Sequence, residues 1–145
     1  MNPSYDEIVK ANSMRGNEIK KTPLIHSTTF SEITESEVYL KAEFRQRTGS
    51  FKIRGAYFKI KSLSDEEKKH GVVAASAGNH AQGMAFASSL EKISCTIVMP
   101  KNASPAKVAA TRGYGANVIL EGTNYEESSA KAKEIAKETG AILIH

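Results

Sequence analysis

The stretch Thr48-Gly49-Ser50-Phe51-Lys52-Ile53-Arg54-Gly55-Ala56 decides the fold that we expect for this part of the chain. The hydroxyl groups of Thr48 and Ser50 stand where a helix needs an N-cap. Apolar residues then recur at positions i, i+3, i+4 and i+7, which predicts a helix with one apolar face, formed by Ile53, Ala56, Tyr57 and Ile60. Lys52 therefore falls in the first turn of this helix, between two apolar residues.

Lys52 has a residue type and a position that favour nucleophilic chemistry. The helix dipole and partial burial both disfavour a charged ammonium, so we expect the pKa of the Lys52 amine to lie below its ordinary value. A neutral lysine amine attacks aldehydes and forms a Schiff base, as it does with pyridoxal phosphate. A lysine at a helix start is also commonly a solvated surface residue, and this stretch alone leaves both interpretations open.

A second stretch, Ser76-Ala77-Gly78-Asn79-His80-Ala81-Gln82-Gly83, follows a short apolar run at 72–75 that reads as a buried strand. Ligands of parallel α/β sheets collect outside the carboxyl ends of strands. A helix beginning near Asn79 would also present backbone N–H groups without intrahelical partners, which suit an anion. The sequence therefore predicts an anion-binding loop here.

Other glycine patterns argue against a nucleotide site. Gly78 and Gly83 have the spacing of a P-loop, but Met84 and Ala85 stand where lysine and Ser/Thr are required. The run at 112–115 lacks the third glycine of a dinucleotide fingerprint. An oxidoreductase-type nucleotide domain is therefore disfavoured.

Together, the two stretches resemble the signatures of the fold-type-II pyridoxal-phosphate enzymes, most closely those of the threonine/serine dehydratases. The first signature runs from Lys41 through Glu43, Gln46 and Thr48 to Ala56, and the second is Ser76–Gly83. The resemblance covers the whole chain. It implies a tryptophan-synthase-β-like α/β fold and pyridoxal 5'-phosphate as the cofactor.

The resemblance also implies roles for individual residues. Lys52 would form the Schiff base and then remove the substrate's α-proton, and Phe51 would pack near the pyridine ring. Asn79 would hydrogen-bond the 3′-oxygen of the cofactor, although it also reads as an ordinary helix cap. The substrate carboxylate would bind a loop of five residues, Ser76, Ala77, Gly78, Asn79 and His80. For His80, forming this loop is favoured over acid/base catalysis.

The reaction implied by the resemblance is β-elimination from L-threonine or L-serine, which gives a 2-oxo acid and ammonia in amino-acid metabolism such as isoleucine biosynthesis. Serine racemase activity is an alternative, but related racemases carry a second serine where this chain has Ala77. Ile53 replaces an aspartate that is typical of threonine synthases. A non-catalytic α/β module that binds a phosphorylated small molecule or a partner chain is an alternative of another class.

Composition sets broader limits on the chain. It has 145 residues, 40% of them hydrophobic and 25% charged, and a formal net charge of +4. Its lysines are mixed with acidic residues and form no basic stripe with aromatics, so no nucleic-acid partner is expected. No apolar run is long enough for a membrane span, and we expect a cytoplasmic protein with a buried Cys95. His26, His70 and His145 lack metal-ligand spacing and are expected at the surface.

Helix and strand patterns alternate along the chain. A helix is expected at 5–15, an extended segment at 21–24, a half-buried strand at 38–43 and a short helix from Ser64 to about His70. Strands follow at 72–75, 95–99, 117–120 and 141–144, and helices lie between them at 79–90, 104–114 and 124–139. This alternation predicts a small domain with a four-stranded parallel sheet flanked by helices.

The resemblance divides the chain into two parts. Residues 1–65 look like the N-terminal segment of a larger α/β domain, and residues 71–145 look like the complete small domain. The glycine-rich phosphate loop, the group that meets the pyridine nitrogen and the rest of the large domain have no counterpart in this sequence. We therefore expect a truncated chain or split gene product that is weakly active or inactive alone. It would form homo-oligomers or pair with the missing C-terminal portion.

Overall fold

A four-stranded parallel sheet forms the centre of the fold in the computed structural model, which describes residues 3–145. Its spatial order is β5-β4-β3-β6, so β6 lies beside β3, the first strand of this sheet along the chain. The strands are β3 (Val72–Ala75), β4 (Cys95–Met99), β5 (Asn117–Leu120) and β6 (Ile142–Leu143). The predicted parallel sheet is confirmed, although the paired part of β6 is shorter than the expected strand.

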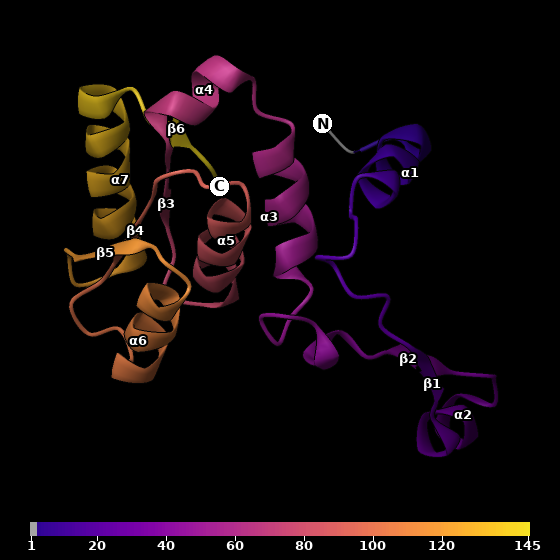
Figure 1. Cartoon of the computed structure of the whole chain (residues 1–145). Coiled ribbons are helices and arrows are strands. Elements are labelled where there is room, and N and C mark those ends of the chain that lie inside the picture. The colour runs from indigo at the N-terminus through magenta and orange to yellow at the C-terminus, as the bar shows by residue number, and fades with distance from the viewer. Residues whose placement is uncertain (1–2) are drawn as a thin grey trace.

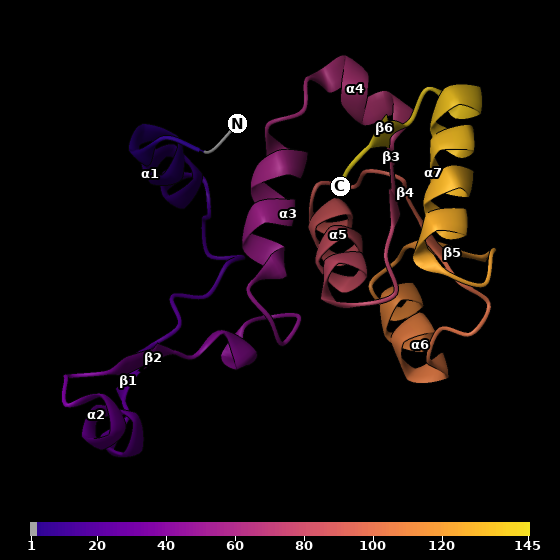
Figure 2. The same cartoon turned by 180° about the vertical axis from the view of Figure 1, so that it is seen from behind.

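Helices cover both faces of this sheet (Figures 1 and 2). On one face lie α5 (Asn79–Leu90) and α6 (Pro105–Gly113), and on the other lies α7 (Tyr125–Thr139). Side chains alternate between the faces of a strand, so β3 serves both layers. Its Val72 and Ala74 join the core that contains α5, whereas Val73 joins a second core with Ala132 of α7.

A further layer is formed by α3 (Lys52–Lys61), which packs along α5 on the side away from the sheet. The predicted apolar face of this helix is confirmed, because its four buried residues are Ile53, Ala56, Tyr57 and Ile60. They share a core with buried residues of α5 such as Met84. This packing fixes the amino-terminal ends of α3 and α5 relative to each other.

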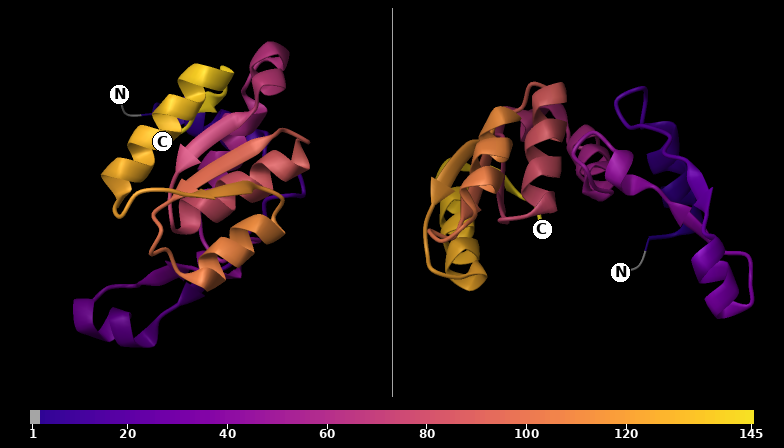
Figure 3. Two further views of the ribbon diagram at one scale, coloured as in Figure 1. Left: turned by 90° about the vertical axis from the view of Figure 1, so that its left-hand side faces the viewer. Right: turned by 90° about the horizontal axis from the view of Figure 1, so that it is seen from below.

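The N-terminal segment projects away from the sheet (Figure 3). It contains α1 (Tyr5–Ser13), β1 (Leu24–His26), α2 (Thr28–Thr34), β2 (Tyr39–Lys41) and the 3-10 helix η1 (Glu43–Arg45). The β1 and β2 strands pair antiparallel. The expected half-burial at 38–43 is confirmed at Val38, which is half-buried, and at Ala42, which is 2% exposed, but it is wrong at Leu40, which is 45% exposed.

Helix caps agree with the sequence at some ends and differ at others. Ser4 and Ser64 form capping boxes at the starts of α1 and α4 (Asp65–His70), and the short helix expected from Ser64 is confirmed. α1 ends at Ser13 rather than Arg15. The expected cap of α3 by Thr48 or Ser50 is wrong, because Phe51 is the N-cap and no side chain caps this end.

Two features are absent from the described residues. Within residues 3–145, no helix is both long and apolar enough to cross a membrane. The same residues contain no group of three or more His, Cys, Asp or Glu side chains that could hold a metal ion.

Candidate active site

The strand order brings two chain segments to one edge of the sheet. β3 pairs with β4 on one side and with β6 on the other. The chain leaves β3 through Ser76 into α5, whereas it reaches β6 from α7, on the opposite face. Ligands in open α/β sheets bind outside the carboxyl ends of strands where the order reverses. The carboxyl ends of β3 and β6 are therefore the expected edge for a site.

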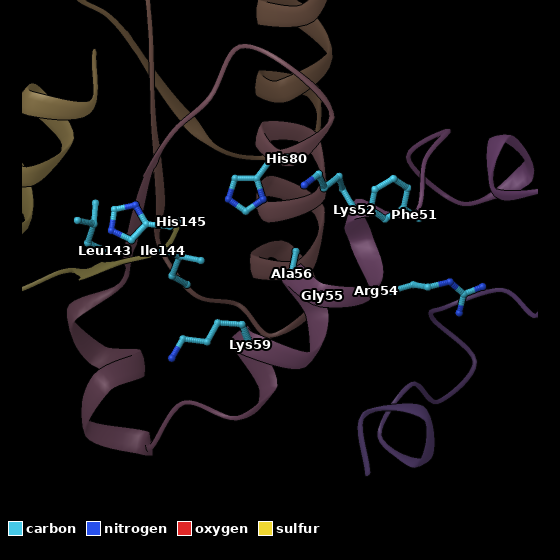
Figure 4. A pocket seen from close by; sticks show the side chains of 10 residues that line it. All are labelled: Phe51, Lys52, Arg54, Gly55, Ala56, Lys59, His80, Leu143, Ile144 and His145. Carbon is cyan, nitrogen blue, oxygen red and sulfur yellow. The ribbon is translucent and has the colours of Figure 1, made fainter. Parts of the chain in front are cut away.

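A cavity of about 500 Å³ lies beside this edge, between the start of α3 and the end of β6 (Figure 4). Its volume is within the usual range for small-molecule sites. It is lined by residues of α3, α5 and the C-terminal strand: Phe51, Lys52, Arg54, Gly55, Ala56, Lys59, His80, Leu143, Ile144 and His145. Segments that lie far apart in the sequence thus share one hollow.

Lys52 is the first residue of α3, and its Nζ end turns toward the imidazole of His80 (Figure 4). The Nζ atom lies 5.4 Å from the centroid of the Phe51 ring. Among the described residues, Lys52 has no ion-pair partner and no side-chain hydrogen bond. The expected partial burial of this side chain is wrong: Lys52 is exposed, and Phe51 beside it is 59% exposed.

His80 is the second residue of α5 and is half-buried. Burial lowers the pKa of its imidazole below the ordinary value, and the positive charge of Lys52 lowers it further. The backbone of Ile144 acts in the opposite direction. The Nε2 atom of His80 is buried and has no hydrogen-bond partner among the described residues. The lowered pKa favours the neutral imidazole near pH 7, and its Nε2 atom is left without a hydrogen bond within the described chain.

The loop before His80 is ordered by Ser76. Its Oγ accepts hydrogen bonds from the backbone N–H of Gly78 at 3.2 Å and of Ala81 at 3.3 Å. Asn79 is the first residue of α5 and is exposed. Of the predicted site residues, the structure brings Phe51, Lys52 and His80 together at the cavity. Four others, Ser76, Ala77, Gly78 and Asn79, lie in the adjoining loop and do not line it.

Several lining residues were not predicted from the sequence. Lys59 follows Lys52 and Ala56 at helical spacing, so the pattern already contained the signal for a shared face. His145 was expected at the surface. It is exposed, but the pairing of β6 with β3 places it at the cavity rim, a position that only the strand order reveals.

The lining suits a flat, anionic group with an aldehyde. Five of the lining residues have nitrogen-bearing side chains, and the described lining residues include no carboxylate side chain. This imbalance favours a phosphorylated ligand. Phe51 and Ile144 add apolar surface, and Lys52 adds a primary amine. The residues present therefore fit pyridoxal phosphate.

Comparison with known proteins agrees with this chemistry. Residues 16–145 match the family model described as "Pyridoxal-phosphate dependent enzyme". The chain belongs to this family. Its members depend on pyridoxal phosphate, and the predicted resemblance, fold class and cofactor are confirmed.

Three members of known name are similar to this chain. L-threonine ammonia-lyase of Thermotoga maritima is 51% identical over 142 residues, which are 98% of this chain and 35% of that protein. A catabolic L-threonine dehydratase of Staphylococcus aureus is 53% identical over 128 residues, 88% of this chain and 37% of that protein. Maize serine racemase superposes with a TM-score of 0.93 and 36% identity, over all of this chain and 44% of that one.

Proposed function

We propose that this chain supplies part of the active site of an enzyme that eliminates the β-hydroxyl of L-threonine or L-serine and releases a 2-oxo acid and ammonia. One observation carries the proposal: the amine of Lys52 and the imidazole of His80 face each other at a cavity whose described lining has no Asp or Glu side chain. The likeness to threonine ammonia-lyases and dehydratases at 51–53% identity supports it. The chain spans only about a third of those relatives, so the activity of the whole protein is part of the proposal.

Lys52 would act first as a nucleophile and later as a base. Its Nζ reaches into the cavity without a competing carboxylate, so it can attach the cofactor's aldehyde covalently and, once displaced by the substrate amine, accept the substrate's α-proton. When bound, pyridoxal phosphate supplies an electron sink for the carbanion that this proton loss creates. Phe51 would offer an apolar ring beside the same amine.

The loop of residues 76–80 would hold the substrate's carboxylate. It lies at the start of α5, where backbone N–H groups and the helix dipole favour an anion. The Ser76 hydroxyl fixes the loop, and Asn79 is exposed at its end. We assign His80, which is neutral, to shaping this loop and the cavity wall rather than to carrying charge.

We also propose the division of labour between the two parts of the chain. Residues 1–65 would belong to the larger domain and supply the amine, and residues 71–145 would form the small domain and supply the carboxylate loop. The helix α4 joins them. The exposed apolar residues of the N-terminal segment would pack in a homo-oligomer or against further chain of the same enzyme, and the assembly would function in the cytoplasm.

Labelling of Lys52 tests the proposal. The protein is mixed with pyridoxal phosphate, the yellow absorbance of the lysine-bound cofactor is recorded, the adduct is reduced with borohydride, and the labelled peptide is mapped. We expect the label on Lys52 and its loss in Lys52→Arg, which keeps the charge. Lys59→Arg is the matched control, because Lys59 lines the same cavity and this variant should retain the label.

Label spread over many lysines, or no adduct, would instead favour a non-catalytic α/β module. Where Lys52 is labelled, formation of 2-oxo acid from L-threonine and L-serine shows whether this chain turns over by itself. Serine racemase activity is the second candidate, favoured by the superposition on the maize enzyme. Chiral analysis of serine recovered from the same reaction distinguishes racemisation from elimination, since elimination with Ala77 in the loop should leave no D-serine.

A further inference from the structure

The first turn of α3 has no side-chain cap, although it presents Lys52. Phe51 occupies the N-cap position without a capping hydrogen bond. The hydroxyl groups of Thr48 and Ser50 are buried nearby and have no partner within the described chain. Uncapped first turns leave backbone N–H groups unsatisfied and tend to fray. Another contact must therefore hold this turn in place.

Arg54, two residues after Lys52, makes that contact. Its Nε donates to Glu43 Oε2 at 2.8 Å, and its Nη2 donates to Glu43 Oε1 at 2.7 Å. This two-point, charge-assisted geometry is the strong form of an arginine–carboxylate pair. The Arg54 guanidinium is the main cause that lowers the pKa of Glu43. The side chains of Glu43 and Arg54 are 16% and 33% exposed, so solvent screens the pair in part.

The same guanidinium also reaches the segment before β1. Nη2 of Arg54 donates to the carbonyl oxygen of Lys20 at 3.1 Å, and that oxygen also accepts from Gln46 Nε2 at 3.0 Å. The Thr22 hydroxyl donates to the Glu43 carboxylate. Three separate segments, around residues 20–22, 43–46 and 52–54, are thereby joined at one point. Arg54 lines part of the cavity, but Figure 4 shows its guanidinium directed away from His80.

We propose that Arg54, held by Glu43, is the positioning residue that keeps the first turn of α3 fixed so that Lys52 faces His80. The role of Lys52 in this proposal rests on the proposed function, but its orientation toward His80 does not. Lysine at position 54 would keep the charge and lose the planar fork, so it could not bind both Glu43 oxygens and the Lys20 carbonyl together.

The unloaded protein offers the first test, because the pKa of His80 responds to the charge of Lys52. The His80 titration midpoint is measured by NMR in the wild type and in four variants: Lys52→Ala, Glu43→Gln, Arg54→Lys and Glu66→Gln. Lys59 and His145 line the same cavity and are unchanged in all of them. Glu66 pairs with Lys69 at the exposed surface of α4, so it gives a matched carboxylate-to-amide control.

We expect Lys52→Ala to move the His80 midpoint upward, toward the ordinary histidine value. Glu43→Gln and Arg54→Lys should move it in the same direction, and Glu66→Gln should leave it unchanged. The proposal is overturned if Lys52→Ala moves the midpoint but the Glu43 and Arg54 variants do not. It is also overturned if Lys52→Ala has no effect, because Lys52 then does not face His80. Urea unfolding of each variant identifies any that has lost its fold. If Glu43→Gln is unfolded, the proposal is tested with Arg54→Lys alone.

A second readout uses pyridoxal phosphate as the probe. The share of reduced label on Lys52, relative to all labelled lysines, should fall several-fold in Glu43→Gln and Arg54→Lys and stay constant in Glu66→Gln. An unchanged share in the first two variants contradicts the positioning role. If the wild type itself places no label on Lys52, the proposed function fails, and the His80 titration still decides whether Arg54 positions Lys52.

Discussion

Gly83 of α5 lies directly against the backbone of Lys52. A Cβ atom at Gly83 would stand 3.2 Å from the carbonyl carbon of Lys52, 3.3 Å from its carbonyl oxygen and 3.2 Å from the backbone nitrogen of Ile53. The absence of a side chain at this position therefore lets the first turn of α3 approach α5. This close approach is what sets Lys52 within one cavity with His80.

Replacing Gly83 by alanine should disturb this approach. The added methyl group meets backbone rather than a flexible side chain, so we expect a destabilisation of about 1–3 kcal/mol, typical of overpacking. The share of pyridoxal-phosphate label on Lys52 should fall as well. Gly113→Ala in α6 is the control, because nothing lies within 4 Å of a Cβ there. Urea unfolding measures the unfolding free energy of both variants, and equal stability of the two would contradict the prediction.

The ion pair of Glu43 with Arg54 predicts a pH dependence of stability. The pKa of Glu43 is lowered from 4.5 in the folded chain, first by Arg54, so the unfolded chain binds the proton more readily. The contribution of Glu43 is therefore complete above about pH 5 and is lost as the pH falls through the lowered pKa. The difference in unfolding free energy between wild type and Glu43→Gln should shrink from pH 7 to pH 3. A difference that stays constant over this range would show that the carboxylate is not stabilised by Arg54.

Cys95 should be inert in the native chain. Burial raises the pKa of its thiol from 9.0 to about 11, and the side chain is 5% exposed. The reactive thiolate is thereby reduced about 100-fold at neutral pH, in addition to the steric block. Reaction with Ellman's reagent should be slow in buffer and fast in urea. Fast native reaction would mean that β4 opens far more readily than its burial indicates.

Two serines at helix starts should differ in their effect on stability. Ser64 accepts from the backbone of Glu67 and completes a capping box, whereas Ser104 occupies the N-cap of α6 without a side-chain hydrogen bond. Ser64→Ala should therefore cost about 1 kcal/mol of unfolding free energy. Ser104→Ala should change it much less. Thermal or urea unfolding compares them, and an equal loss in both would contradict the observed caps.

Local patterns predicted much of the fold. The apolar spacing that follows Lys52 places four residues in the core, and the four strand patterns form the parallel sheet. These features depend on neighbours within a few residues of one another, which sequence spacing captures directly. The alternation at 38–43 was right for Ala42, which is buried, but wrong for Leu40, which is 45% exposed. Alternation reports that a strand has two faces and does not report what covers them.

For the site, the sequence predicted roles for Lys52 and for the loop of residues 76–80, and these roles stay predictions. Lys52 and His80 both line the cavity, as the two motifs suggested. The rest depends on pairing between distant segments. His145 reaches the site only because β6 lies beside β3, and Arg54 holds its turn through Glu43, eleven positions earlier. Neither partner can be inferred from local spacing.

The pairing of β6 with β3 has a consequence for the order in which the chain folds. Val72 meets Ile142 across this pair, so the wall containing Leu143, Ile144 and His145 closes only after the whole intervening chain has been made. Such distant contacts carry a large loop-closure entropy and form late. The hollow beside Lys52 therefore takes shape later than the local turns and helices on either side of it.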